Sequence, residues 1–267
     1  MISNTLHLAA ERRNGSTVLA RVHAQGLWRS SRPFREGIAT HVVVSQLGPG
    51  MIRGDRFNTT GAVGQNAHLI VTGQMATRIL PGRVPVATHA AWTVADGGTL
   101  ELLNEPTIVT AGATLDAHLT LELEGDARAV ISDIVSRTAG STVRTAMKVE
   151  RNDHIALIDV LQLDGVLDDA DTVIGTLTIL GGRTDLAALD RIADACKDVR
   201  IGIGTFESGD TLARVAAAHV APVREALTRL HASLGLDRAE ASRASRWVRG
   251  RSWPWIDCNE ASIRRAP

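Results

Sequence analysis

The chain has 267 residues, enough to bury a large core as one domain or as one domain with a smaller appendage. Lys+Arg and Asp+Glu are equal at 29 each, so no global charge favours nucleic acid or an acidic membrane surface. The two cysteines, Cys196 and Cys258, form no C-x-x-C pair, which excludes a disulfide framework. With no visible signal peptide and no run of about 18 apolar residues, we expect a cytoplasmic protein without a membrane span.

Residues 16 to about 165 have the composition of a β-rich segment. Short runs of Val, Thr, Leu and Ile alternate with Gly, Asn and Asp, which is the pattern of strands and turns. Several runs are apolar at both parities, so we expect strands that are covered on both faces. The runs are Thr40–Gln46, His68–Thr72, Thr99–Leu103, Leu119–Leu123, Arg128–Val135 and Ile155–Leu161.

A weak internal repeat runs through this segment. Four tight polar turns each precede a run of apolar residues, and the first residues after them are Ala67, Thr99, Ala127 and His154. The offsets are 32, 28 and 27 residues, which suggests stacked β coils or a layered sandwich with a period of about 30. Ordinary spacing in a β-meander remains the alternative.

The pattern changes after residue 171. We expect a strand at Thr172–Leu180, a helix capped by Thr184 or Asp185, a strand at Val199–Phe206 and an amphipathic helix at Val220–Leu234. The stretch Thr211–Ala218 fits either a strand or the start of the last helix. The predicted fold is therefore mainly β, with coiled or layered, β-helix-like sheets in residues 1–170, and a smaller β-α-β-α appendage of about two helices in residues 171–236.

The last 31 residues, 237–267, differ from the rest. They contain three of the five Trp and seven Arg against four acids, without a defensible period. Basic residues interleaved with Trp are compatible with a nucleic-acid or membrane patch. We favour an irregular terminal tail, because chain ends commonly fray.

The search for an active site finds little. The chain has no phosphate-binding G-x-x-x-x-G-K-[ST] loop, no G-x-S-x-G elbow and no H-E-x-x-H motif. Its nine His are scattered, so no dedicated zinc site can be argued. Cys196 lies on the apolar face of its predicted helix, where a buried and inert thiol is expected.

Two isolated carboxylates stand out within apolar β segments, Asp133 and Asp159. A carboxylate in a buried strand must be paired, hydrogen-bonded or hydrated, because desolvating it alone costs several kcal/mol. Pairing with an Arg, bonding to backbone N–H groups or exposure on a sheet face would each satisfy this need. The functional alternative is a polar lining for an internal passage that carries a cation.

Three segments in the central block resemble the UreD (UreH) family of urease accessory proteins, and they occur in the family's order. Gln46–Asp55 resembles the family's glycine-rich segment, which ends in Gly-Asp. Leu69–Arg78 is similar to its Thr-x-Gln-x-Ala-[ST]-Lys segment, with Arg78 in place of the Lys. Leu100–Ile108 resembles its Leu-Glu-x-Leu-Pro-x-Pro-x-Ile segment, with Asn104 in place of the first Pro.

The resemblance implies a non-catalytic, coiled-sheet scaffold for urease maturation. Its expected partners are a UreF-type accessory protein, a UreG-type GTPase recruited through UreF, and apo-urease. No tightly bound cofactor and no nucleic acid are expected; only Ni(II) would bind, transiently, with Asp133 and Asp159 as its possible ligands. The family's polar interior positions correspond here to Asp55, Thr77, Asp133 and Asp159. The turn residues that carry the family motifs are Gly50, Gly54, Gln74, Arg78 and Pro106.

Two other functions remain open. A β-solenoid enzyme that acts on carbohydrate could use Asp133 and Asp159 as an acid and base pair. The absence of Tyr and the presence of only three Phe argue against it, because sugar sites commonly stack on aromatic rings. The other possibility is a β-rich binding protein of unknown ligand, with the tail at residues 237–267 as a candidate nucleic-acid contact.

Overall fold

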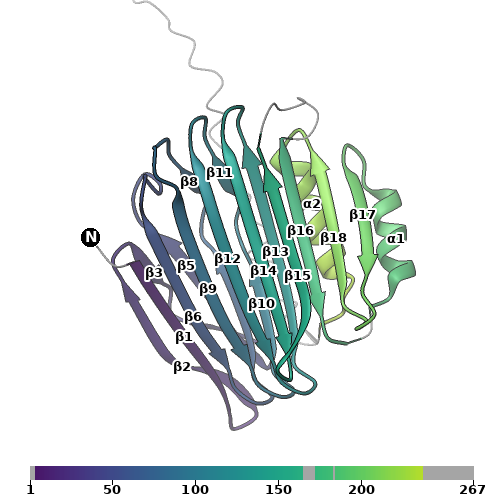
Figure 1. The fold of residues 1–267 in the computed structure, drawn as a ribbon. Helices are drawn as coiled ribbons and strands as arrows, with labels where there is room; N and C mark the ends of the chain where they lie inside the picture. The colour runs from purple at the N-terminus through teal and green to yellow at the C-terminus, as the bar shows by residue number, and fades with distance from the viewer. Residues whose placement is uncertain (1–3, 165–171, 183, 237–267) are drawn as a thin grey trace, which may run out of the picture.

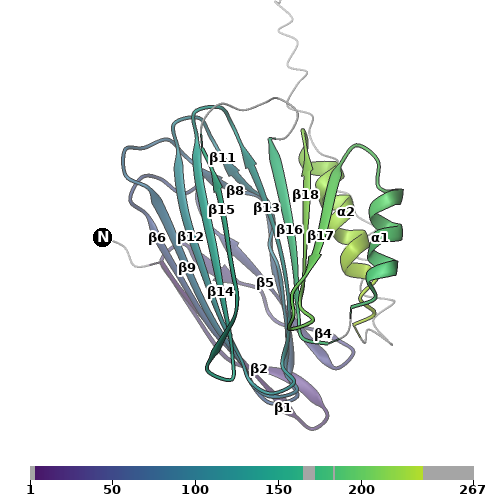
Figure 2. The same ribbon diagram turned by 45° about the vertical axis from the view of Figure 1, so that its right-hand side comes forward.

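The computed structural model describes residues 4–164, 172–182 and 184–236. Two β-sheets pack face to face, with two helices against the outer face of one of them (Figure 1, Figure 2). Sheet A has seven strands, in the spatial order β15 (His154–Leu163), β14 (Thr142–Arg151), β12 (Thr114–Leu123), β9 (Val86–Val94), β6 (Arg56–Val63), β1 (Asn4–Arg13) and β2 (Ser16–Gln25).

Sheet B has eleven strands. Its main path runs through β17 (Arg200–Thr205), β18 (Thr211–Ala217), β16 (Val173–Leu180), β13 (Arg128–Arg137), β10 (Thr99–Leu103), β7 (His68–Gly73), β5 (Ala39–Gln46) and β3 (Trp28–Ser30). Three short strands join it at the side, namely β4 (Phe34–Glu36), β8 (Thr77–Ile79) and β11 (Thr107–Val109). The helices are α1 (Leu186–Ala195) and α2 (Val220–Ala232).

The middle of the chain winds as a β-solenoid. It passes from a strand of sheet B to a strand of sheet A and back, so that β7, β10 and β13 pair in parallel and β6, β9, β12 and β14 do the same. Thr99 is in register with His68 on one side and with Arg128 on the other, which corresponds to the predicted period of about 30 residues. Stacked coils are therefore confirmed, and a simple meander is excluded for this part.

The fourth turn of the predicted repeat is different from the others. Asn152 and Asp153 both have positive φ, at 50° and 62°, which is the geometry of a two-residue hairpin turn. This turn joins β14 to β15 as antiparallel neighbours within sheet A. The expectation that it begins another coil was wrong, because a two-residue turn is too short to cross to the other sheet.

The predicted runs all lie in strands, and both predicted helices are present. Thr211–Ala217 is a strand, and β1 at Asn4–Arg13 is an additional strand that the composition did not indicate. Asp185 caps α1, since its side chain accepts a hydrogen bond from the backbone N–H of Ala188 at 3.0 Å. Strands β16, β17 and β18 extend sheet B directly, whereas the division into domains at residue 170 stays a prediction.

Three clusters of buried side chains form the core. The lower core fills the space between the sheets around Leu69, Trp92 and Leu121. The upper core lies between the sheets at the other end of the strands, around Phe57 and Ile79. A third cluster, the helix core, joins the helices to the outer face of sheet B. None of the helices in the described part of the chain is long and apolar enough to cross a membrane.

Candidate functional site

Between the lower and upper cores, the inner faces of the sheets carry polar side chains. Along β13, Ile131 belongs to the lower core and Val135 to the upper core. Successive side chains of a strand alternate between its faces, so Asp133 points to the same inner side and lies between the two cores. We name the polar groups at this level the inner polar band, and its members are Thr77, Asn104, Asp133, Asp159, Arg214 and the sheet A hydroxyls of Thr59, Thr88 and Thr145.

Asp133 has one side-chain hydrogen-bond partner among the described residues. The amide of Asn104, at the end of β10, donates to its Oδ1 at 2.6 Å. Burial raises the pKa of the Asp133 carboxyl above its ordinary value, while the hydrogen bond from Asn104 acts in the opposite direction. The carboxyl retains some solvent contact, so it can exchange a proton or accept a cation.

Asp159 lies at the edge of the band, on strand β15 of sheet A. It forms an ion pair with Arg214 of strand β18, which belongs to sheet B, so this contact ties the two sheets together. The Nη1 atom of Arg214 is buried and has no hydrogen-bond partner within the described residues. Asp159 is therefore neutralised by a neighbouring cation, which weakens its attraction for a metal ion.

Thr77 also lies on the inner side. It is two residues before Ile79 of the upper core, so the two side chains share a face. In the sheet, Thr77 is in register with Thr107, and Thr107 is in register with Val135. The hydroxyl of Thr77 is therefore placed two strands away from β13, near the upper limit of the band.

Asp55 lies apart from the other three. It belongs to the turn before β6, where its Oδ2 accepts a hydrogen bond from the backbone N–H of Ile52 at 2.9 Å. That contact is the local role expected of Asp in a tight turn. The structure thus places Thr77, Asp133 and Asp159 on inner faces and Asp55 in an end loop, and no group of three His, Cys, Asp or Glu in the described residues could hold a metal ion together.

The family-motif residues gather where the coils change direction. Gly50 has a φ of +147°, and a Cβ at this position would lie 2.7 Å from the backbone oxygen of Arg78, so the close approach requires glycine. Gly54 also has a positive φ, of +74°, and a Cβ there would lie 3.7 Å from a side-chain atom of the following loop. Pro106 accepts a hydrogen bond from the N–H of Thr77 at 2.9 Å. Gln74 and Arg78 are exposed.

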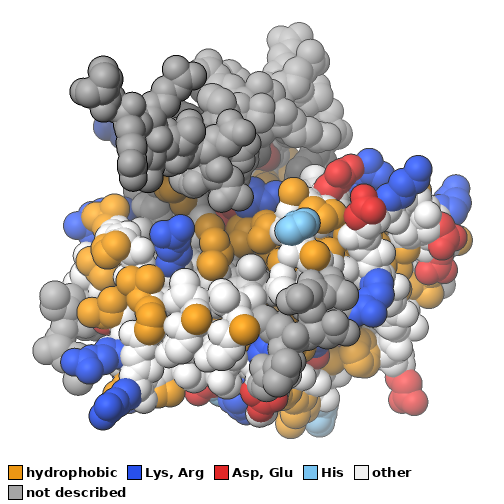
Figure 3. Space-filling model, turned by 90° about the horizontal axis from the view of Figure 1, so that it is seen from above, with side chains coloured by type: hydrophobic (Ala, Val, Ile, Leu, Met, Phe, Trp, Pro, Cys, Tyr) orange, Lys and Arg blue, Asp and Glu red, His pale blue; other side chains and the backbone are white. Residues whose placement is uncertain are grey.

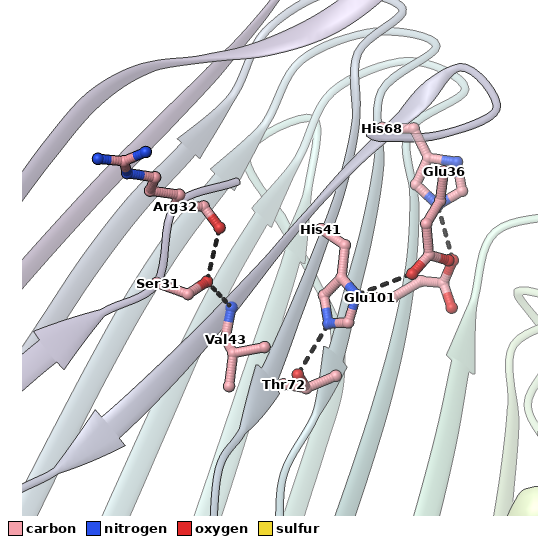
Figure 4. A network of polar contacts seen from close by, with 8 residues as sticks. All are labelled: Ser31, Arg32, Glu36, His41, Val43, His68, Thr72 and Glu101. Atoms are coloured by element: carbon pink, nitrogen blue, oxygen red, sulfur yellow. Dashed lines mark hydrogen bonds and ion pairs between the residues drawn. The ribbon is translucent and has the colours of Figure 1, made fainter. Parts of the chain in front are cut away.

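The structure also reveals a buried polar cluster that we did not predict. Glu101 is 0 % exposed on the outer face of sheet B, beneath α2. Its Oε1 lies 2.7 Å from Nε2 of His68 on β7, and its Oε2 lies 2.7 Å from Nε2 of His231 on α2. Figure 4 shows His68 and Glu101 facing each other across neighbouring strands. We call these three residues the outer clamp.

Two opposing effects act on Glu101. Burial alone would raise its pKa, but the hydrogen bonds and charges of His231 and His68 outweigh burial and hold the pKa well below its usual range. On the same sheet face, His41 contacts Glu36 and Thr72 at 2.8 Å each (Figure 4). The apolar context of Glu101, in Leu100-Glu101-Leu102, is the signal that could have identified it, since Asp133 was identified in that way.

Two hollows in the described surface lie beside the helices. One of about 140 Å³ is lined by the Gly181–Gly182 turn and the start of α1, and one of about 540 Å³ lies between α1 and α2. Neither lies between the sheets or contains a residue of the inner polar band. The members of the band are half-buried, except Asn104, which is exposed, so solvent reaches the space between the sheets at this level.

This coiled scaffold can be compared with known proteins. The sequence model of the family described as UreD urease accessory protein matches residues 3–249. The chain belongs to the UreD urease accessory protein family. Its fold, with three motif segments on neighbouring coils, is thus one example of a UreD architecture.

Individual UreD proteins are similar along most of their length. The UreD of Bacillus sp. (strain TB-90) is 27% identical over 250 residues, which cover 86% of this chain and 92% of the relative. The UreD of Sorangium cellulosum (strain So ce56) is 26% identical over 246 residues, covering 84% and 79%. That of Methylobacterium sp. (strain 4-46) is 28% identical over 243 residues, covering 81% and 85%. Membership of this family supports a role in urease maturation.

Proposed function

We propose that this UreD-family chain is a cytoplasmic, non-catalytic scaffold that helps deliver nickel to urease. In this role it binds a UreF-type protein, recruits a UreG-type GTPase through it, and docks on apo-urease. The observation that carries the nickel part of the proposal is the inner polar band, in which sparse oxygen ligands lie between two apolar cores. Family membership carries the part that concerns urease.

The chemistry of the band suits a transient cargo. Nickel binds strongly to sites that combine several imidazole, thiolate or carboxylate ligands. A station that must release the ion needs few ligands, and the band offers isolated carboxylates and hydroxyls. Burial raises the pKa of the Asp133 carboxyl, so a bound cation and a proton compete for this group more closely than at an exposed carboxylate.

The four predicted polar positions would have unequal roles in this proposal. Asp133 is the principal station, because its single described partner is a neutral amide. Asp159 is a secondary one, since a cation there competes with Arg214. Thr77 would offer a hydroxyl, and Asp55 would shape the end loop rather than contact the ion.

The carbohydrate-enzyme alternative is disfavoured by the same geometry. Asp133 and Asp159 point between the two sheets, and Asp159 is occupied by its ion pair with Arg214, so neither is presented on an open surface that could hold a sugar chain. The proposed contact of nucleic acid with residues 237–267 lies outside the described residues.

Co-expression with the UreF-type protein and apo-urease of the same genome tests the proposal. We expect a stoichiometric complex by affinity capture and size-exclusion chromatography, and nickel-dependent activation of urease. Asp133→Ala should lower the nickel content of urease strongly and Asp159→Ala less so. The control is Glu122→Ala, which removes an exposed acid from the outer face of sheet A.

Two results would contradict the proposal in different ways. A folded chain that forms no complex with either partner would argue against the scaffold role. If the complex forms and Asp133→Ala activates urease as well as Glu122→Ala does, the scaffold role is supported but Asp133 is not a nickel ligand.

A further inference from the structure

The end of the solenoid shown uppermost in Figure 1 is built from stacked loops. Residues 47–55 join β5 to β6, and residues 80–85 join β8 to β9. Backbone hydrogen bonds hold the two loops together, from Met51 N–H to Arg78 O at 2.7 Å and from Leu80 N–H to Met51 O at 2.9 Å. Pro49, Pro81 and Pro85 stiffen these loops further, so little conformational freedom would be lost if a partner bound them.

Large apolar side chains are exposed on these loops. Leu47 is 43% exposed, Ile52 52% and Val84 55%. A Cβ on Gly54 would lie 3.7 Å from Cγ1 of Val84, so the two loops present one continuous surface. Exposed apolar side chains that cluster on rigid loops mark a contact surface more often than isolated ones do.

Arginines surround these apolar residues. Arg53, Arg78 and Arg83 are exposed, and none of them has an ion-pair or hydrogen-bond partner for its side chain within the described residues. Asp55, the one acid in either loop, is occupied by the N–H of Ile52. We call the six residues Leu47, Ile52, Val84, Arg53, Arg78 and Arg83 the arginine end face. Figure 3 looks down on this end, where hydrophobic and basic side chains lie beside one another on the left.

The opposite end of the solenoid has the reverse character. The turns at residues 64–67, 95–98, 124–127 and 152–153 carry Asp96, Glu124, Asp126 and Asp153, all exposed, and no large apolar side chain. One exposed large apolar residue, Ile38, lies at this end in the turn before β5. The turns bond to one another, for example from Asp126 N–H to Oδ1 of Asp96 at 2.7 Å. A second copy stacked head to tail would match the charges but would leave the apolar residues of the arginine end face without a complement.

We infer that the arginine end face docks a protein partner of the urease assembly that presents carboxylates around an apolar contact. Arginine suits this role because its guanidinium pairs with carboxylates in a bidentate manner and tolerates an apolar surrounding. The apolar residues would supply affinity, and the arginines would supply orientation and the rate of association. The inference rests on the proposed function, since the partner is one of the proteins with which the scaffold assembles.

Charge reversal tests the inference. We would measure the dissociation constants for the co-purified UreF-type protein and for apo-urease, each at about 50 and about 300 mM NaCl, a range over which surface charge is progressively screened. Arg53→Glu/Arg83→Glu should weaken one of the two complexes by about tenfold or more at low salt and reduce its salt dependence. Ile52→Ser/Val84→Ser should weaken the same complex and leave its salt dependence unchanged.

The matched control is Arg12→Glu/Arg21→Glu, which reverses two exposed arginines on β1 and β2. It should bind within about threefold of the unaltered chain, and circular dichroism should show that all variants fold. If the unaltered chain binds and both end-face variants bind equally well, the inference is wrong while the scaffold role stands. If the unaltered chain binds neither protein, both the scaffold role and the docking role of the arginine end face are wrong. Self-association that the end-face variants abolish, without partner binding, would identify a second copy as the occupant.

Discussion

Two carboxylates of sheet B, Glu101 and Asp133, lie on opposite faces of the sheet and have opposite surroundings. On the outer face, Glu101 has a histidine on each carboxylate oxygen and is fully buried beneath α2. On the inner face, Asp133 has a neutral amide as its described partner and keeps some solvent contact. The pKa of Glu101 is consequently lowered, and that of Asp133 is raised.

The difference suggests separate roles for the two carboxylates: Glu101 stabilises the fold, and Asp133 is the proposed ligand. A buried charge that is fully paired stabilises the contact between elements, and its removal leaves the partners unsatisfied. A buried carboxyl that is incompletely paired is costly in the free energy of folding and available for a ligand. The outer clamp holds α2 to the solenoid, whereas the inner polar band is the part that we propose binds nickel.

Of the substitutions considered, the removal of Glu101 should lower the free energy of unfolding most. Glu101→Ala leaves His68 and His231 without their carboxylate and opens a cavity under α2, so we expect the free energy of unfolding to fall by about 3–5 kcal/mol. Urea denaturation followed by circular dichroism measures this loss. The exposed Glu122→Ala should change it by less than about 0.5 kcal/mol. A loss of less than about 1 kcal/mol for Glu101→Ala would show that the clamp is not a stabilising element.

The outer clamp also predicts how stability depends on pH. Because the folded-state pKa of Glu101 is lowered, ionised Glu101 stabilises the fold above the unfolded-state pKa of about 4.3, and this contribution is lost as the pH falls towards the folded-state pKa. The melting temperature of the unaltered chain should therefore drop from about pH 5 downward. Glu101→Gln should show a flatter acid limb, and parallel limbs would contradict the assignment.

Removing one histidine should break half of the clamp. His231→Ala removes the hydrogen bond between α2 and Oε2 of Glu101, and we expect a loss of about 1–3 kcal/mol in the free energy of unfolding. Arg224 still bonds to Glu105 at 2.6 Å, so α2 should remain attached at its other end. Hydrogen exchange should show faster exchange confined to the last turns of α2, and faster exchange throughout sheet B would indicate a wider role for His231.

The sequence predicted the coils because period and strand pattern are local properties. The turns that precede Ala67, Thr99 and Ala127 combine glycine with Asn or Asp, which the left-handed backbone at these positions requires. Strand β1, which lies between β6 and β2 in sheet A, was missed, since its alternation in Thr5-Leu6-His7-Leu8 is short and interrupted by Ala9 and Ala10. The distinction between coil and hairpin at Asn152 depends on how many residues the turn contains, and the polar composition shared by the four turns does not show that this one has only two.

The site was predicted in part for a similar reason. Isolated carboxylates in apolar strands are visible in a sequence, so Asp133 and Asp159 could be found. Their partners could not, because Asn104 and Arg214 lie 29 and 55 residues away and meet them only through the stacking of coils and the extension of sheet B. His231 is 130 residues from Glu101, and no local pattern connects them.

Asp133→Asn should raise the free energy of unfolding, whereas Glu101→Ala should lower it. Ionised Asp133 costs stability once the pH exceeds its unfolded-state pKa, because its folded-state pKa is raised, and the neutral amide avoids this cost. We expect a gain of about 0.5–2 kcal/mol at neutral pH, together with weaker activation of urease. Thermal unfolding at pH 7.5 measures the gain. A loss of stability would show that Asp133 is structurally satisfied as a carboxylate.

The smallest change in the free energy of unfolding should come from the ion pair between Asp159 and Arg214. Asp159 belongs to the inner polar band, as Asp133 does, but has a cationic partner. The side chains of the pair are 22% and 28% exposed, so solvent screens the pair, and we expect a coupling of about 0.2–1 kcal/mol in a double-mutant cycle of Asp159→Asn and Arg214→Gln. Arg214→Gln frees Asp159 of its neighbouring cation and should therefore increase Ni(II) binding by the isolated chain, measured by calorimetry against the double variant. If the coupling instead exceeds about 3 kcal/mol, Asp159 belongs with Glu101 as a structural carboxylate, and Asp133 remains as the sole station of the band.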